Sequence, residues 1–311
     1  MRFTSVWKHF PHADQQAETL AKETLLFQQK FNCDFIKVTP TGTWQAVCMG
    51  AVDEPLNDIL GRRAVKAPFI NVTDDWLSIP DFAQTKPWAL EEVIRTCQII
   101  CAETKVPVLT TIFCPITQAV QLAGINTFMN HVKQAEYEVK AGIDKITDNT
   151  LHAIEKLKET GIKGIFFVTQ YRQPHLMQPD IYKEFGEPAD IRCLQKCRDL
   201  DFNIFHIHGE NVDLNLKPLP DNCLLHIEYT PANVKHMTRF AGDLKKVLTG
   251  IPISEMLSCD TLEDIKLCVQ KYRNMNRDAI AMSPACVIPV DFPEQLLKKW
   301  VSVLQEVAVE I

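Results

Sequence analysis

Two histidines and a distant cysteine are the residues of this chain whose types and spacing are best suited to chemistry. The stretch NIFHIHGENVD, residues 203–213, places His206 and His208 one residue apart at the end of a short apolar run. In a β-strand, residues i and i+2 point to the same side, so both imidazoles would face one way and Ile207 the other. Cys286 closes a later apolar run. Imidazole and thiolate both bind zinc, and three protein ligands leave the open position typical of a catalytic zinc site.

Four more polar residues lie near the ends of other apolar runs. Glu228 would be a catalytic residue, either as a displaceable fourth ligand or as a hydrogen-bonding partner of the ligands. Lys37, Gln170 and Asn211 are candidates for binding substrate in a pocket. Ordinary hydrogen bonding in loops explains these residues equally well, and the His-x-His spacing by itself leaves simple packing open for both histidines.

The elements that must position these residues recur along the chain. Short apolar runs rich in β-branched residues alternate with longer segments of helical period, and the runs are apolar on both faces, as in parallel strands covered by helices. The predicted strands lie within residues 34–40, 106–115, 161–170, 202–208, 223–230, 245–252 and 278–286, with residues 67–76 as a weaker candidate.

This alternation predicts a (β/α)₈ TIM barrel in a single domain over residues 1–311, with an N-terminal helical segment at about 12–31 and the barrel at about 34–311. A doubly wound open sheet is disfavoured because the chain has no Gly-rich phosphate-binding motif. Residues 41–105 and 116–150 are expected to wall the barrel mouth, where the C-terminal strand ends carry the active site. The helix at 12–31 would pack on the barrel or against a second copy in a homodimer.

Helix-start signals accompany several of the predicted helices. Thr230 followed by Pro231 is typical of an N-cap, and Gly242 would stop that helix. Asp260 and Asp291 are the predicted N-caps of the last two helices.

Composition and charge exclude some classes of function. The formal net charge of −6 argues against non-specific nucleic-acid binding, which needs a basic face. The chain shows neither a signal-peptide pattern nor an apolar run of the roughly 20 residues that span a membrane. Its 11 scattered cysteines suit a reducing compartment. These features predict a cytoplasmic protein that acts on neither membranes nor nucleic acids.

Two motifs resemble the uroporphyrinogen decarboxylase superfamily. FHIHG at 205–209 and MSPACVIPVDFPEQLL at 282–297 look like the H-x-C-G and S-P-G-C-x-I-P motifs of its zinc-dependent methylcobalamin:thiol (coenzyme M) methyltransferase branch. FIKVTP and GIFFVTQ are also similar to the family at their places. The chain departs from the pattern twice, because His208 stands where the methyltransferases have Cys, and Ala285 replaces a Gly.

The resemblance implies a (β/α)₈ barrel in which His206, His208 and Cys286 hold Zn²⁺. It also implies an enzyme that moves a methyl group to a small thiol from methylcobalamin or a methyl-corrinoid protein. The corrinoid would come from outside the chain, because no D-x-H-x-x-G corrinoid-binding motif is present.

Two other functions remain open. A metal-independent decarboxylase of porphyrinogen acetates, a carboxy-lyase, would need arginines for the substrate carboxylates, and the N-terminal stretch VWKHFPHADQQAETL has none. A non-catalytic homologue that binds a corrinoid or a protein is the third hypothesis.

Overall fold

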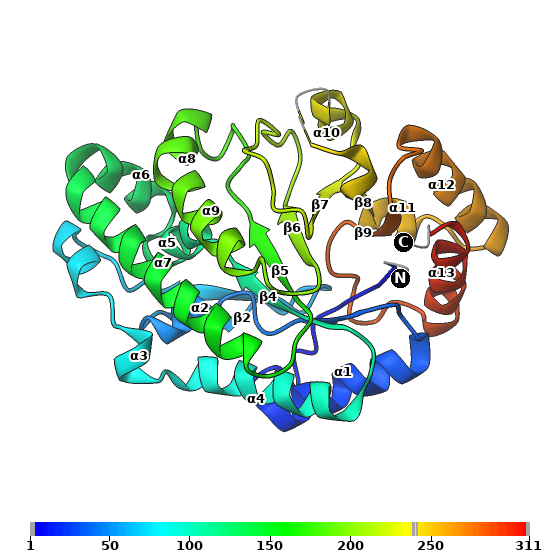
Figure 1. The fold of residues 1–311 in the computed structure, drawn as a ribbon, viewed down its shortest axis with the longest axis horizontal. Helices are drawn as coiled ribbons and strands as arrows, with labels where there is room; N and C mark the ends of the chain where they lie inside the picture. Colours follow the sequence, from blue (N-terminus) through cyan, green and yellow to red (C-terminus); the bar gives the residue numbers. More distant parts are fainter. Residues whose placement is uncertain (1–3, 238–239, 241, 309–311) are drawn as a thin grey trace.

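The predicted strands assemble into one parallel sheet. The computed structural model describes residues 4–237, 240 and 242–308, and within them seven strands are ordered β1-β4-β5-β6-β7-β8-β9 (Figure 1). The strands are β1 (Ile36–Val38), β4 (Val108–Phe113), β5 (Gly164–Thr169), β6 (Asn203–Ile207), β7 (Cys223–Glu228), β8 (Val247–Ile251) and β9 (Ala281–Pro284). Each falls inside a predicted strand region, so the α/β class with a parallel sheet is confirmed.

The sheet curls as part of a barrel, but the predicted closed eight-stranded barrel is not confirmed. Among the described residues no ladder joins β1 to β9. Residues 4–10 lie between these two edges instead. The carbonyl of Thr4 accepts from the Asp34 amide and that of Trp7 from the Ile288 amide, each at 2.9 Å. These isolated bonds hold an extended segment against both edges without continuing the ladder.

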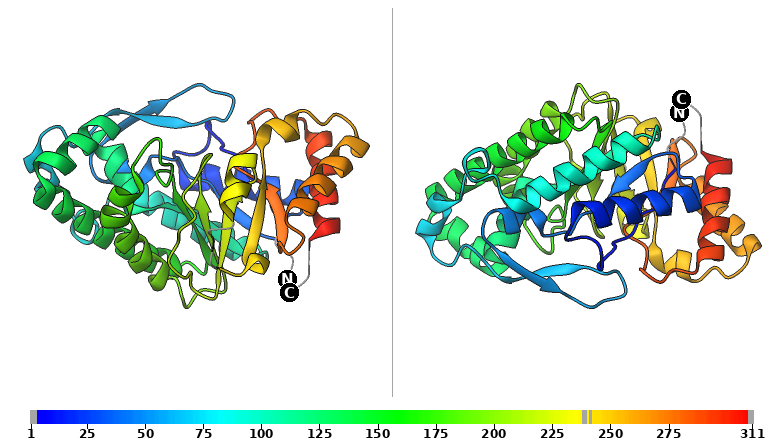
Figure 2. Two further views of the ribbon diagram at one scale, coloured as in Figure 1. Left: turned by 90° about the horizontal axis from the view of Figure 1, so that it is seen from above. Right: turned by 90° about the horizontal axis from the view of Figure 1, so that it is seen from below.

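Helices pack around the outside of the curled sheet, and a hairpin extends along one side of it (Figure 2). The helices are α1 (Ala17–Phe31), α2 (Trp44–Cys48), α3 (Phe82–Thr85), α4 (Trp88–Glu103), α5 (Pro115–Ala123), α6 (Ile125–Gln134), α7 (Glu136–Lys158), α8 (Pro179–Phe185), α9 (Glu187–Lys196), α10 (Pro231–His236), α11 (Ile253–Leu257), α12 (Leu262–Met275) and α13 (Glu294–Val307). The hairpin pairs β2 (Val52–Pro55) with β3 (Arg63–Ala67). None of the described helices is long and apolar enough to cross a membrane.

Local signals at the helix ends were predicted with mixed success. Thr230 caps α10 by accepting from the Asn233 amide, as predicted, but α10 ends at His236, well before Gly242. The prediction for Asp260 was wrong, because Thr261 caps α12 and forms a reciprocal capping box with Asp264. Asp291 is not a cap either, since α13 begins after Pro293.

The weaker strand candidate at 67–76 was also wrong. Strand β3 ends at Ala67, and Thr73–Ser78 forms a short 3₁₀ helix. Pro68 follows β3 directly, and because proline has no amide hydrogen it cannot extend the ladder.

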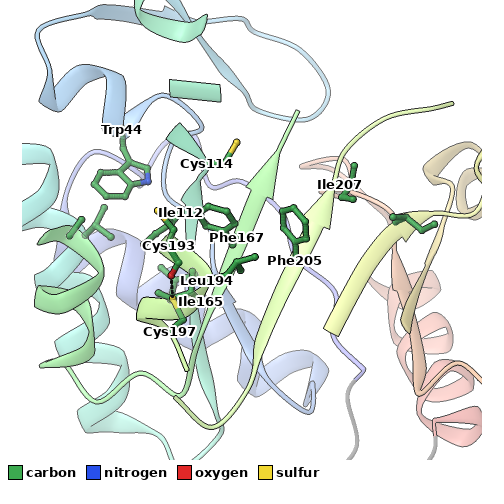
Figure 3. Packing of buried hydrophobic residues seen from close by; sticks show 14 of the residues in the cluster. Trp44, Ile112, Cys114, Ile165, Phe167, Cys193, Leu194, Cys197, Phe205 and Ile207 are labelled. Atoms are coloured by element: carbon green, nitrogen blue, oxygen red, sulfur yellow. Dashed lines mark hydrogen bonds between the residues drawn. The ribbon is translucent and has the colours of Figure 1, made fainter. Parts of the chain in front are cut away.

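Alternation along the strands divides the core into two layers. Phe167, Phe205 and Ile207 belong to the outer cluster, which packs against helices such as α9 (Figure 3). Phe166 and Ile204 belong to the inner cluster enclosed by the sheet. Because side chains alternate with period 2, the outward position of Ile207 directs His206 and His208 inward.

A buried polar chain holds the end of β5. The Tyr182 hydroxyl lies 2.6 Å from Asp190 Oδ2 and 2.7 Å from Thr169 Oγ1, directly before Gln170. Burial raises the pKa of Asp190 to about 7, although bonding to Tyr182 and the nearby Arg172 oppose the rise. The carboxyl group is therefore poorly suited to carry charge at this place.

Asp190→Asn is expected to stabilise the protein in a pH-dependent way. A carboxyl whose pKa is raised on folding costs stability above the folded value, so the variant gains on the order of a few kcal/mol at pH 8. The gain should shrink as pH falls from about 7 and vanish near the ordinary value of 3.8. Urea unfolding at pH 4.5, 6 and 8 measures it, and a gain that is independent of pH would contradict the charge explanation.

Candidate active site

A cavity of about 450 Å³ opens at the C-terminal ends of the strands. Ends of β1, β4, β5 and β6 form its floor, the β2–β3 hairpin forms one wall, and Trp7 and His9 of the N-terminal segment form another. Its size lies within the range of roughly 300–1,000 Å³ that is usual for small-molecule sites.

Five of the seven predicted site residues line this cavity. They are Lys37, Gln170, His206, His208 and Cys286. Glu228 lies just outside the lining, partly buried and close enough to His208 for their charges to interact. Asn211 is exposed, with φ of 52°, and is not part of the lining.

His208 and Cys286 are in direct contact. Their side chains interact, although His208 directly follows β6 and Cys286 lies in the segment after β9. Burial raises the pKa of the Cys286 thiol, but the bond from His208 and its positive charge outweigh burial and lower it. Burial lowers the pKa of His208, but the interaction with Cys286 outweighs burial, so the pKa of His208 is raised. The interaction therefore shifts the pair toward thiolate and imidazolium.

His206 lies deeper, in an apolar and histidine-rich layer. Its ring centroid is 5.7 Å from that of His208 and 4.7 Å from that of His226. Burial and the neighbouring His226 lower the pKa of His206, so it remains neutral. Its Nδ1 is buried without a hydrogen-bond partner. A neutral imidazole with a free nitrogen is the form that binds a metal.

The donor set suits a borderline-soft cation such as Zn²⁺. His206 offers an unpartnered buried nitrogen, and His208 and Cys286 already touch. In the conformation described for residues 4–237, 240 and 242–308, however, no three His, Cys, Asp or Glu side chains converge on a metal position. The residue types fit zinc. In the present arrangement, however, Cys286 interacts with His208, and the three side chains do not converge on one position.

Lys37 contributes a basic group to the cavity and, among the described residues, has no carboxylate partner. Its side chain is buried, and Nζ lies 4.7 Å from the Phe166 ring centroid, 5.4 Å from that of Trp7 and 3.4 Å from Thr39 Oγ1. Within the described part of the chain it forms no ion pair with an acidic group. Burial lowers its pKa to about 7, against the opposing effect of Cys286.

Sequence reasoning missed the cationic groups that the hairpin brings to the cavity. Arg62 and Arg63 line it, but each is paired with a hairpin carboxylate, Asp58 at 2.6 Å and Asp53 at 2.8 Å. No Asp or Glu lines the cavity among the described residues. The adjacent arginines were visible in the sequence, but only the folded hairpin shows which cavity they face.

Comparison with known proteins establishes the family. The family described as "Uroporphyrinogen decarboxylase (URO-D)" matches residues 4–307, so the chain belongs to the uroporphyrinogen decarboxylase family. The resemblance seen in the two motifs is thereby confirmed at the level of the family. No curated protein matches the chain in sequence.

The fold is shared with solved structures of other proteins, of which two are described. A methyltransferase from Methanosarcina mazei superposes with a TM-score of 0.78 and 16% identity, over 98% of this chain and 93% of that one. A B12-independent methionine synthase from Shewanella sp. W3-18-1, in complex with selenomethionine, gives a TM-score of 0.56 and 12% identity, over 94% and 86% of the two chains. At these identities the similarity concerns the fold.

Proposed function

We propose that this protein is an enzyme that transfers a methyl group to the sulfur of a small thiol, with a corrinoid from outside the chain as donor. The observation that carries the proposal is the contact between Cys286 and His208 in a cavity lined by basic and apolar side chains and, among the described residues, by no acid. Such a cavity stabilises a thiolate, which is the form of a thiol that attacks a methyl group.

The zinc ligands in this proposal are His206, His208 and Cys286. Zn²⁺ would supply positive charge that lowers the pKa of the substrate thiol at its open position. His208 and Cys286, which already interact, would both bind the ion. His206 would use its unpartnered nitrogen, and partly buried Glu228 would interact with His208 from outside the cavity lining.

The remaining side chains orient the substrate. Lys37 presents a cation to an anionic group of the thiol, and its aromatic neighbours Trp7 and Phe166 keep water from it. Gln170 lies on the β5 side of the cavity and offers an amide for hydrogen bonding. One structural neighbour is a methyltransferase and the other is a B12-independent methionine synthase.

Metal content tests the proposal directly. The purified protein is expected to hold about one zinc per chain, and a His206→Ala/Cys286→Ala double variant to hold none. A His175→Ala/Cys101→Ala variant, which changes the same residue types away from the cavity, should keep the metal. If the unmodified protein holds no zinc even after zinc has been supplied, the proposed zinc-dependent reaction is rejected.

Decarboxylation of a polycarboxylate is the second candidate function. The family description and the basic lining, with Lys37, Arg62 and Arg63, favour it. Two observations weigh against it: both arginines are already neutralised by hairpin carboxylates, and no acidic residue of the described lining is available to protonate a pyrrole. Release of CO₂ from a porphyrinogen by metal-free protein would establish this function instead.

A further inference from the structure

Asn233 is a buried residue that joins three segments next to the candidate site. It lies in the first turn of α10, and its side chain is fully buried. The side-chain nitrogen Nδ2 donates to the carbonyls of Gly209 and Glu228, each at 2.8 Å. The side-chain oxygen Oδ1 accepts from the Val212 amide at 2.9 Å. One side chain thus ties the loop after β6 to the end of β7.

The loop that Asn233 holds begins at the residue after His208. Gly209 has φ of 100°, in the region that favours glycine, and a Cβ there would lie 2.1 Å from Gln173 Oε1. Gln173 in turn donates to the Gln170 carbonyl at 2.8 Å. The turn therefore fits closely against the β5 side of the site, while Asn233 holds it from the β7 side.

These bonds are not needed to begin the helix. Thr230 already caps α10 through its hydroxyl, and the Asn233 backbone amide is the donor of that bond, at 3.2 Å. The carboxamide of Asn233 is directed at three groups outside α10 instead. The bond from the Val212 amide is buried and the bonds to the two carbonyls are part-buried. A buried donor or acceptor that loses its partner costs about 1–3 kcal/mol.

We propose that Asn233 is a positioning residue for the reaction, and that it holds the turn after His208 so that the imidazole meets Cys286. It acts through the Gly209 carbonyl and the Val212 amide and touches neither substrate nor metal. The same side chain fixes the carbonyl of Glu228, so it sets the place of His208 relative to the end of β7. This inference rests on the proposed function only in assigning His208 and Cys286 to the reacting site.

The test compares Asn233→Ala with Asn149→Ala. Asn149 is a matched control, because it is also buried, bridges backbone groups and is not part of the cavity lining. It donates to the Pro80 carbonyl at 2.8 Å and accepts from the Phe82 amide at 3.0 Å. The readout is the imidazole ¹⁵N resonances of His208 in the full-length protein, identified by their loss in His208→Gln. Urea unfolding and, where turnover is found, kcat and KM are measured alongside.

Both variants are expected to lose stability, but only Asn233→Ala should move or broaden the His208 resonances. Its kcat/KM should fall roughly 10- to 100-fold, as for other groups that orient metal-binding histidines. Unchanged His208 resonances in Asn233→Ala would overturn the proposal. If that variant does not fold, Asn233→Asp keeps the size and the acceptor for Val212 but loses both donated bonds, and the same shift is expected.

The two levels of inference fail separately. Altered His208 resonances in a protein that shows no thiol methylation would leave the positioning role standing and reject the proposed function. Unchanged His208 resonances in Asn233→Ala, in a protein that does methylate thiols, would reject the positioning role and leave the proposed function standing.

Discussion

Cys286→Ser is expected to reduce thiol methylation by more than about 100-fold and to abolish zinc binding. Removal of groups that only orient a metal ligand typically costs about 10–100-fold, and loss of the ligand itself should cost more. Serine is close to cysteine in shape and can still form hydrogen bonds, but its hydroxyl is not the soft anionic donor that zinc prefers. The change also removes the thiol whose interaction with His208 raises the pKa of that histidine.

A matched control separates this effect from the general loss of a thiol. Cys101→Ser changes another partly exposed cysteine, which lies on α4 and is not part of the cavity lining. Initial rates of methylcobalamin demethylation with a panel of small thiols, together with elemental analysis, provide the measurements. A Cys286→Ser enzyme that retains both zinc and its rate would show that the thiol has no part in the reaction.

Lys37→Met is expected to weaken catalysis and to strengthen the fold. If Lys37 binds an anionic group of the substrate, loss of a charged hydrogen bond costs about 1.5–3 kcal/mol, which is roughly 10- to 100-fold in KM. Methionine has a similar length and suits the aromatic contacts with Trp7 and Phe166. For thiols without an anionic group, KM should change little in Lys37→Met. These thiols are therefore the control for the anionic ones.

The stability effect of Lys37→Met has a defined dependence on pH. Burial lowers the lysine pKa from 10.5 to about 7, so the unfolded chain binds this proton more tightly than the folded protein. The resulting cost is fully present below about pH 7, on the order of several kcal/mol, and disappears as pH rises to the unfolded value.

Removing the amine should therefore raise the free energy of unfolding at pH 6 and leave it nearly unchanged near pH 10.5. Lys8→Met is the control, because Lys8 is only half-buried and lies outside the cavity lining. Denaturant unfolding of the parent and of both variants across this pH range measures the effect. A variant that is less stable than the parent at pH 6 would show that Lys37 is stabilised by the fold rather than strained by it.

Much of the site could be predicted because it depends on local rules. The alternation of side chains along a strand put His206 and His208 on the inner face and Ile207 on the outer one. The late motif around Cys286 pointed to the family that the comparison confirms. These features follow from residues close together in the sequence, so pattern alone was enough.

Other predictions failed because they depended on neighbours that local pattern does not specify. Asp260 and Thr261 are both good caps, and only the geometry of the following turn selects Thr261. Closure of the barrel depended on whether an eighth segment could pair along its length with both edges. Residues 4–10 make only isolated bonds there, and Trp7 and His9 become part of the cavity wall instead.

The amino-acid sequence is sufficient to predict the strands, the inward face of the His-x-His motif and the family, because hydrophobic period and motif chemistry are local properties. Which residues these side chains meet depends on the tertiary structure. It brought Cys286 to His208, buried Lys37 without a carboxylate partner among the described residues, and neutralised Arg62 and Arg63 inside the hairpin. Such pairings join strands and loops far apart in the chain, and their energies depend on burial and distance, which no local pattern contains.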